Sequence, residues 1–261
     1  MSRRFAGRTA LITGAARGIG LAIAEELAAQ GADVALHVRK ATPEAALLAA
    51  RVAACHDVRA AIVAGDLANP EQHEAIFSAF DRRFDRLDML VNNAGYEGPA
   101  KLETMPLADW NGVIDVNLTA PFRVSQLAQP RMATSGGGVI VNISSIHEEV
   151  PRKGFAHYSV AKAGLRMLTR SCALEWAEFG IRAVTVSPGA IETDINRDVI
   201  EAIGRGTFDE WIPLGIGTTN DVAKLVAFIC SDDARYMTGT EVYLDGGYMR
   251  NLVRYDGRPD R

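Results

Sequence analysis

Short apolar runs of four to seven residues alternate with longer helical segments along the whole chain. The runs are rich in valine, isoleucine, leucine and alanine, a composition typical of strands that are buried on both faces. Strands that alternate with helices pair in parallel through right-handed crossovers. The pattern predicts an α/β fold in one domain spanning residues 1–261: a single doubly wound, Rossmann-type parallel sheet of about seven strands with helices on both faces. The strands are expected at residues 9–13, 33–38, 60–64, 87–91, 139–143, 181–187 and 241–244.

A glycine-rich turn, Gly-Ala-Ala-Arg-Gly-Ile-Gly, follows the first of these runs at residues 14–20. Glycine lets the backbone approach a pyrophosphate closely, and the helix that begins here offers unpaired N–H groups and a positive dipole end. The spacing differs from the usual Gly-x-Gly-x-x-Gly fingerprint, and a tight turn without a ligand would use the same residues. The nucleotide-binding interpretation assigns cofactor contacts to Gly14, Arg17, Gly18, Ile19 and Gly20.

Two cationic residues, Arg39 and Lys40, follow the second predicted strand, where NAD-selective sites often place an acid. Together with Arg17 they would form a pocket for the 2′-phosphate of NADP, which arginine can bind through two parallel hydrogen bonds. The alternative is that both residues are solvated in a loop. The sequence therefore favours NADP as the cofactor, with NAD as the second choice.

Small and polar residues follow the other predicted strands. Each group could be an ordinary turn. In a doubly wound sheet, however, ligands bind beyond the carboxyl ends of the strands, so these groups are expected to converge on one edge. This convergence is the main reason to expect an enzyme. The residues concerned are Asp66, Leu67, Asn93, Ala94, Gly95, Ser145, Pro188 and Gly189.

Tyr158 and Lys162 lie one turn apart in a helical segment predicted at residues 155–179. A phenol is a poor proton donor or acceptor at neutral pH, and an ammonium one turn away is expected to lower its pKa. Ser145 adds a hydroxyl at a strand end. Asn117, in an apolar stretch of a helix expected at residues 109–132, needs partners if it is buried. Taken alone, Tyr-x-x-x-Lys more often forms an amphipathic surface.

Composition excludes several function classes. A formal net charge of −4 gives no reason to expect nucleic acid or an anionic membrane as a partner, and no apolar run is long enough to span a bilayer. Residues 1–5 lack the apolar core of a signal peptide. Cys55, Cys172 and Cys230 lack metal-ligand spacing and are expected to be buried free thiols. We expect a cytoplasmic protein that acts on a small molecule.

The motifs TGAARGIG (13–20), NNAG (92–95), YSVAK (158–162) and PGAIET (188–193), with Asn117 and Ser145 in register, resemble the short-chain dehydrogenase/reductase family over essentially the whole chain. The resemblance implies that Tyr158 is the general acid/base and that Lys162 lowers its pKa and binds the nicotinamide ribose. It also implies that Ser145 holds the substrate oxygen, that Asn117 supports a proton relay, and that the enzyme is a homotetramer. It adds Ile191 and Thr193 to the cofactor contacts, along with Tyr158, Lys162, Pro188 and Gly189.

Within that family the chain is similar to glucose 1-dehydrogenase-like aldose dehydrogenases, which oxidise the C1 hydroxyl of a sugar to a lactone. The similarity and the polar character of the region indicate substrate contacts at Glu97, Ser145, His147, Arg152, Lys153, Tyr158 and Asn196. The adjacent cations Arg152 and Lys153 depart from the pattern of the glucose enzymes and suggest an anionic group on the sugar. A substrate lid is expected at about residues 190–215. The alternatives are a 3-oxoacyl thioester reductase acting on acyl carrier substrates and a catalytically silent nucleotide-binding regulator.

Overall fold

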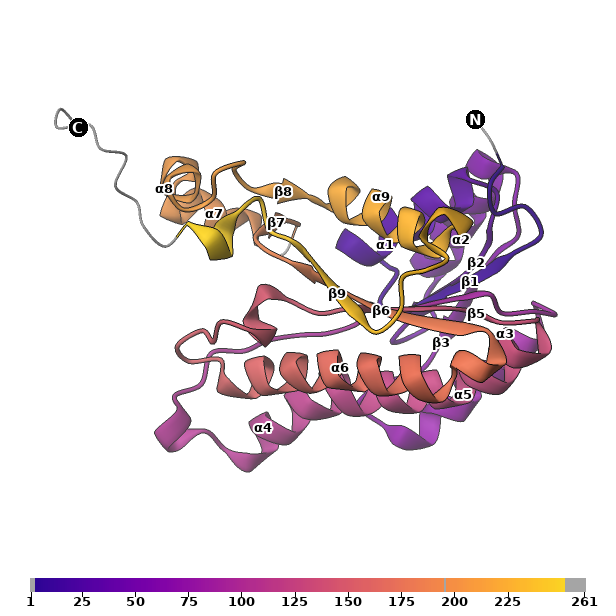
Figure 1. The fold of residues 1–261 in the computed structure, drawn as a ribbon, viewed down its shortest axis with the longest axis horizontal. Helices are drawn as coiled ribbons and strands as arrows, with labels where there is room; N and C mark the ends of the chain where they lie inside the picture. Colours follow the sequence, from indigo (N-terminus) through magenta and orange to yellow (C-terminus); the bar gives the residue numbers. More distant parts are fainter. Residues whose placement is uncertain (1–2, 195, 252–261) are drawn as a thin grey trace, which may run out of the picture.

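The computed structural model describes residues 3–194 and 196–251. A seven-stranded, all-parallel sheet in the order β3-β2-β1-β4-β5-β6-β9 forms the centre of the molecule (Figure 1). This confirms the predicted doubly wound sheet. The strands are β1 (Thr9–Ile12), β2 (Asp33–Val38), β3 (Ala60–Ala64), β4 (Met89–Asn92), β5 (Gly138–Ile143), β6 (Ile181–Pro188) and β9 (Thr240–Leu244). A separate short pair is formed by β7 (Ile191–Glu192) and β8 (Gly217–Thr218).

Helices cover both faces of the sheet (Figure 1). One layer holds α1 (Gly18–Ala29), α2 (Pro43–His56) and α9 (Thr219–Cys230), and the other holds α3 (His73–Asp81), α4 (Leu107–Ile114), α5 (Ala120–Thr134) and α6 (Ala156–Glu175). Two short helices, α7 (Arg197–Ile203) and α8 (Arg205–Trp211), lie at the end of the sheet where β9 leads out. The single-turn 3-10 segments are Pro70–Gln72, Leu102–Thr104, Ile146–Glu148, Ala177–Phe179, Asp232–Ala234 and Tyr248–Arg250.

Local sequence explains where these helices begin. Thr42 caps α2 by accepting from the Ala45 N–H, and Pro43 follows in the first turn, where a missing N–H costs nothing. At α9, Thr218 and Asp221 form a capping box. The N-termini of α2 and α9 are therefore set by capping residues that can be recognised in the sequence.

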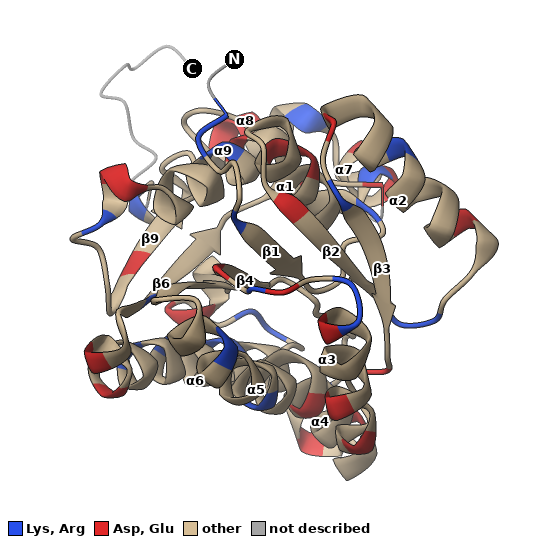
Figure 2. Ribbon diagram, turned by 90° about the vertical axis from the view of Figure 1, so that its right-hand side faces the viewer, with Lys and Arg blue, Asp and Glu red and all other residues tan. Residues whose placement is uncertain are grey.

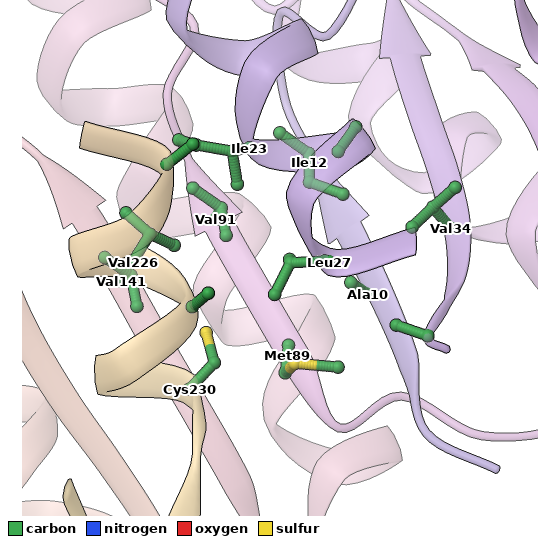
Figure 3. Packing of buried hydrophobic residues seen from close by; sticks show 14 of the residues in the cluster. Ala10, Ile12, Ile23, Leu27, Val34, Met89, Val91, Val141, Val226 and Cys230 are labelled. Atoms are coloured by element: carbon green, nitrogen blue, oxygen red, sulfur yellow. The ribbon is translucent and has the colours of Figure 1, made fainter. Parts of the chain in front are cut away.

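The core is divided by the sheet, because successive residues of a buried strand point to opposite faces. In β1, Ala10 and Ile12 pack with the α1 and α9 layer, while Leu11 packs with the α3, α5 and α6 layer. Figure 3 shows the first of these clusters, in which Leu27 of α1 and Val226 of α9 meet side chains of the central strands. Burial of both faces of the central strands fixes their register and so fixes where each of them ends.

The long helix predicted at residues 109–132 is interrupted. A π-helical segment, Asp115–Thr119, separates α4 from α5 and contains the fully buried Asn117. Pro121, in the first turn of α5, has no N–H to donate to the carbonyl of residue 117, so the regular bonding pattern cannot pass this point. The interruption therefore lies on the N-terminal side of Pro121.

The surface carries mixed charge. In Figure 2 acidic and basic residues are interspersed over the outer helices of the view. Within the described residues, no helix combines the length and the apolar character that crossing a membrane requires. Cys172 and Cys230 are buried as expected, whereas Cys55 is exposed on α2, because its helix packs on the sheet through other positions.

Candidate active site

The glycine turn lies against the loop that follows β4. Gly14 and Gly18 have φ of 66° and 59°, a left-handed conformation that favours glycine. A Cβ on Gly20 would lie 2.4 Å from both the Asn93 amide nitrogen and the Gly14 carbonyl oxygen. The Asn93 amide donates to the backbone oxygens of Thr13, at 2.9 Å, and Gly14, at 3.3 Å. Two predicted cofactor segments therefore meet, and only glycine allows this approach.

Two residues that were not among the predicted cofactor contacts, Thr13 and His37, stabilise the glycine turn and the loop after β4. The Thr13 hydroxyl accepts from the backbone N–H groups of Asn93 and Ala94, at 2.9 and 3.0 Å. His37 accepts from the Gly14 N–H through Nδ1 and donates to the Gly65 carbonyl through Nε2. Burial lowers the pKa of His37 to about 4, so the ring is neutral at ordinary pH. The only sequence signal for a structural role of Thr13 or His37 was that each lies near the end of a predicted strand.

The residues predicted to bind the 2′-phosphate are cationic and accessible. Arg17, Arg39 and Lys40 are all exposed, and no ion pair to a carboxylate forms at any of the three within the described residues. Asp66, by contrast, uses Oδ1 to accept from the Ala68 N–H, which gives it a local turn-capping role. Because three unpaired cations beside a glycine turn match an additional phosphate, the residues fit NADP.

Ser145, Tyr158 and Lys162 come together where β5 ends and α6 begins. Ser145 is buried, and its hydroxyl interacts with Tyr158. Lys162 is also buried; its Nζ donates to the Ile143 carbonyl at 3.0 Å and lies 5.4 Å from the centre of the Tyr158 ring. The predicted serine–tyrosine–lysine group is thus assembled by one strand end and one helix.

The predicted lowering of the Tyr158 pKa is wrong for this structure. Burial raises the pKa of Tyr158 to about 12, and the negative charge of Glu97 adds to the shift, while the Ser145 hydroxyl and Arg152 oppose it. Burial also lowers the pKa of Lys162 to about 8. Helical spacing placed the two groups on one face, but it carried no information on how deeply both are buried.

Asn117 faces the same pocket from the π segment. Its Nδ2 donates to the carbonyls of Tyr96, at 2.9 Å, and Val113, at 3.0 Å, while Oδ1 has no hydrogen-bond partner among the described residues. A Cβ on Gly95 would lie 2.5 Å from that Oδ1 and 3.6 Å from the Lys162 ammonium. An unsatisfied acceptor beside a buried ammonium has the polarity expected for a proton-relay position.

The last cofactor segment, after β6, folds back toward the glycine turn. The Gly189 N–H donates to the Leu244 carbonyl, and a Cβ on Gly189 would lie 2.8 Å from the Asp245 Cα. The nearest neighbour of a Cβ on Gly18 would be the Thr193 methyl group, at 3.8 Å. Pro188 ends β6, and Ile191 is buried in β7. The predicted cofactor residues thus lie along one edge of the sheet.

The predicted substrate residues divide into two groups. His147 lies edge-on to Tyr158 with ring centres 6.4 Å apart, and Arg152 pairs with Glu97 at 3.0 Å beside the same site. Lys153 is exposed. Asn196 lies instead within the loop after β7: its Oδ1 accepts from the backbone and hydroxyl of Thr193, and its Nδ2 donates to the Ile191 carbonyl.

These bonds occupy the Asn196 amide and give it a role in shaping the loop. The predicted lid at residues 190–215 contains α7 and α8, and residue 195 lies outside the described residues. Glu192 forms ion pairs with Arg197 and Arg205, which join both helices to β7. In the described part of the chain, no cluster of His, Cys, Asp and Glu is suited to hold a metal ion.

Comparison with known proteins places this geometry in context. A family model described as enoyl-(acyl carrier protein) reductase matches residues 14–249. The chain is 37% identical over 244 residues to 3β-hydroxysteroid dehydrogenase 1 of Eggerthella lenta, covering 92% of this chain and 93% of that protein. It is 34% identical over 250 residues to glucose 1-dehydrogenase 2 of Bacillus subtilis, covering 95% and 96% respectively.

A solved structure extends the similarity to a cofactor complex. Gluconate 5-dehydrogenase from Burkholderia cenocepacia, in complex with NADP and tartrate, is 34% identical and superimposes with a TM-score of 0.89, covering 96% of this chain and 98% of that one. The relatives act on steroids, sugars and sugar acids according to their names, so similarity alone does not identify the substrate.

Proposed function

Because the chain belongs to the short-chain dehydrogenase/reductase family, an oxidoreductase family that acts on CH–OH groups, we propose that its substrate is an aldose, whose C1 hydroxyl it oxidises to a lactone. NADP is the favoured cofactor and NAD the second choice, in agreement with the unpaired cations Arg17, Arg39 and Lys40 and with a relative solved with NADP. Bound NADP would supply the hydride acceptor.

The residues beside Tyr158 would handle the proton. In oxidation Tyr158 accepts the proton of the substrate hydroxyl, and Ser145 holds the substrate oxygen. Ser145 and Arg152 oppose the effect of burial on the pKa of Tyr158. We expect the Lys162 ammonium, 5.4 Å from the centre of the ring, to favour the phenolate form as well. Asn117 accepts a hydrogen bond from the relay through its unpartnered Oδ1.

The observation that supports a sugar is the polar wall on one side of Tyr158. His147 lies against the ring, and the Glu97–Arg152 pair acts on the Tyr158 charge. A polyhydroxylated substrate could add hydrogen bonds to these polar groups, whereas a steroid or an acyl chain has few polar atoms to offer them.

An anionic group on the sugar is the finer part of this proposal. Glu97 already neutralises Arg152, which stacks on Phe155 at 4.0 Å from the ring centre, so Lys153 carries the uncompensated charge. An Arg152→Ala and Lys153→Ala double variant should raise KM for the anionic sugar and leave neutral sugars unchanged. An equal effect on both substrate classes would remove this part of the proposal.

The testing experiment measures reduction of NADP and of NAD by the purified protein against a panel of neutral and C6-anionic aldoses. Turnover of an aldose supports the proposal. Inactivity on every sugar together with oxidation of NADPH on a 3-oxoacyl thioester would establish the alternative, a reductase of acyl carrier substrates. Binding of NADP without turnover in either assay would instead favour a nucleotide-binding regulator.

We also propose a homotetramer with one domain per chain and a substrate lid at about residues 190–215. Support for assembly comes from apolar side chains on the outer face of α6, where Val160, Met167 and Leu174 recur every seventh residue and are exposed. The three cysteines are free, which suits a reducing cytoplasm.

A further inference from the structure

A pocket of about 270 Å³ lies at the amino ends of the central strands, on the edge of the sheet opposite Tyr158 and the glycine turn. Its lining comes from residues that precede or begin β1, β4, β5 and β6, and from the end of α9. Ligands of a doubly wound sheet bind at the carboxyl ends of the strands, so neither the cofactor nor the substrate of the proposed reaction accounts for this pocket. Its volume is just below the range of about 300–1,000 Å³ that is common for small-molecule sites.

The side of the pocket that β5 contributes has no side chains, because residues 136–138 are all glycine. A Cβ on Gly137 would lie 2.5 Å from the Gly180 carbonyl oxygen, so close packing of the backbone requires glycine there. Met89 and Cys230, which belong to the buried cluster in Figure 3, line the pocket as well. Burial raises the pKa of the Cys230 thiol to about 12, so the thiol is neutral. The charge of the pocket therefore comes from its arginines and aspartates.

Three arginines and two aspartates line the pocket, which leaves one positive charge in excess: Arg8, Arg86, Arg182, Asp88 and Asp232. Arg8 Nη2 donates to both carboxylate oxygens of Asp232 at 3.0 Å, and Arg86 pairs with Asp88. Arg182 forms no ion pair with a carboxylate of the described residues; its Nη1 and Nη2 donate to the carbonyls of Met237 and Ile229. The half-buried charge of Arg182 is therefore the uncompensated one.

Each of the three guanidinium groups has N–H donors left over. Arg8 uses only Nη2, so its Nε and Nη1 have no acceptor in the described part of the chain. The same holds for Nε of Arg182 and for Nη1 of Arg86. Burial lowers the pKa of Arg182, and the charge of Arg8 lowers it further, while Cys230 and Asp232 act in the opposite direction. Two like charges thus lie near each other, an arrangement that a bound anion would stabilise.

We propose that this pocket binds a phosphate group, either as free phosphate or as part of a small phosphorylated metabolite. Guanidinium groups bind phosphate through parallel charge-assisted hydrogen bonds. A phosphate offers at least three acceptor oxygens to donors that come from three separate strand ends, whereas a carboxylate offers two. The site is distinct from the residues predicted to bind the 2′-phosphate of NADP, which lie at the carboxyl ends of the strands, and its occupancy requires no turnover.

The test is isothermal titration calorimetry of the whole protein with inorganic phosphate, at an ionic strength held constant with chloride. NADP is present at saturation, so that the glycine turn and the residues predicted to bind its 2′-phosphate are already occupied. Arg8→Gln should weaken phosphate binding at least about tenfold, through the loss of charge-assisted hydrogen bonds. Its partner Asp232 has an 82% exposed side chain, so the lost ion pair should cost the fold little.

Two further variants separate the pocket from the surface around it. Arg4→Gln is the matched control, because Arg4 forms a similar exposed pair with Asp233 but does not line the pocket. It should leave the phosphate affinity unchanged. Asp232→Asn removes the carboxylate that competes for Arg8 and should strengthen phosphate binding about threefold.

Titration with glycerol 3-phosphate distinguishes the two sources of the phosphate group. Tighter binding of the ester would support a phosphorylated metabolite as the ligand, and tighter binding of inorganic phosphate would support the free ion. The proposal is overturned if the protein shows no saturable phosphate binding, if Arg8→Gln binds phosphate as tightly as the wild type, or if Arg4→Gln loses as much affinity as Arg8→Gln.

Discussion

The contact between Gly95 and Asn117 allows a sharp test of the site geometry. Gly95 has an ordinary backbone conformation, so Gly95→Ala adds a methyl group without dihedral strain. That methyl would lie 2.5 Å from the Asn117 Oδ1, well inside the 3.4 Å at which ordinary contact begins. One of the two partners must therefore move by about 1 Å.

The expected cost has two parts. Overpacking of a buried site typically destabilises a protein by about 1–3 kcal/mol. Because Asn117 and Lys162 line the same pocket, a displacement of about 1 Å should also lower kcat/KM by about 100-fold. Affinity for NADP should change much less, since the glycine turn around Gly14 is not touched.

The assay compares Gly95→Ala with Gly98→Ala in the same loop, using urea unfolding, NADP binding and turnover of the sugar that the panel identifies. A Cβ on Gly98 meets nothing within 4 Å, so that variant should keep full activity and gain about 0.4–1 kcal/mol from a less flexible unfolded chain. If Gly95→Ala matched Gly98→Ala in both stability and kcat/KM, the close packing of Asn117 would have no role in catalysis.

The remaining predictions concern the cofactor and the dependence on pH. Arg39→Ala with Lys40→Ala should weaken NADP binding at least about tenfold, the loss of one or two charge-assisted bonds, and leave NAD binding unchanged, measured by fluorescence titration. Lys162 loses its proton as pH rises through about 8, so NADP affinity should fall above that pH, with the decline absent in Lys162→Arg. His37 has a pKa of about 4 in the folded protein against 6.5 when unfolded, so the unfolded chain binds more protons and stability should fall by about 3 kcal/mol as pH drops from 6.5 toward 4. His37→Gln, measured by urea unfolding, should remove most of that dependence.

Each of these three predictions would be contradicted by a specific result. Equal losses for NADP and NAD in the double variant would show a general effect on the fold rather than recognition of the 2′-phosphate. A constant NADP affinity through pH 8 would mean that the charge of Lys162 does not contribute to cofactor binding. An unchanged pH profile in His37→Gln would assign the acid sensitivity to other groups.

The fold was predictable because its signals are local and repeated. Buried strands appear as apolar runs, and β2 and β3 have the bounds that the sequence predicts. The π segment at Asp115–Thr119 was not predicted, because helical periodicity continues through it and only the absent N–H of Pro121 indicates a disruption. Topology then brings the predicted cofactor residues to one edge of the sheet.

The electrostatics of the site were not predictable in the same way. Spacing placed Tyr158 and Lys162 on one helix face but did not show that burial moves both of their pKa values. Glu148 and Glu149 are alike in the sequence, yet one is buried and the other pairs with Arg166 at the surface. Asn196 has a polar side chain that suits a substrate, but its oxygen and its nitrogen both bond within the loop.

The most direct test follows the hydrogen at C1 of the sugar. Purified protein would be supplied with NADP and an aldose carrying deuterium at C1, and the reduced cofactor analysed by NMR. The account predicts one deuterium on the nicotinamide of each reduced cofactor, and a loss of turnover of at least about 100-fold in Tyr158→Phe. Reduced cofactor without deuterium, or a Tyr158→Phe variant as fast as the wild type, would contradict it.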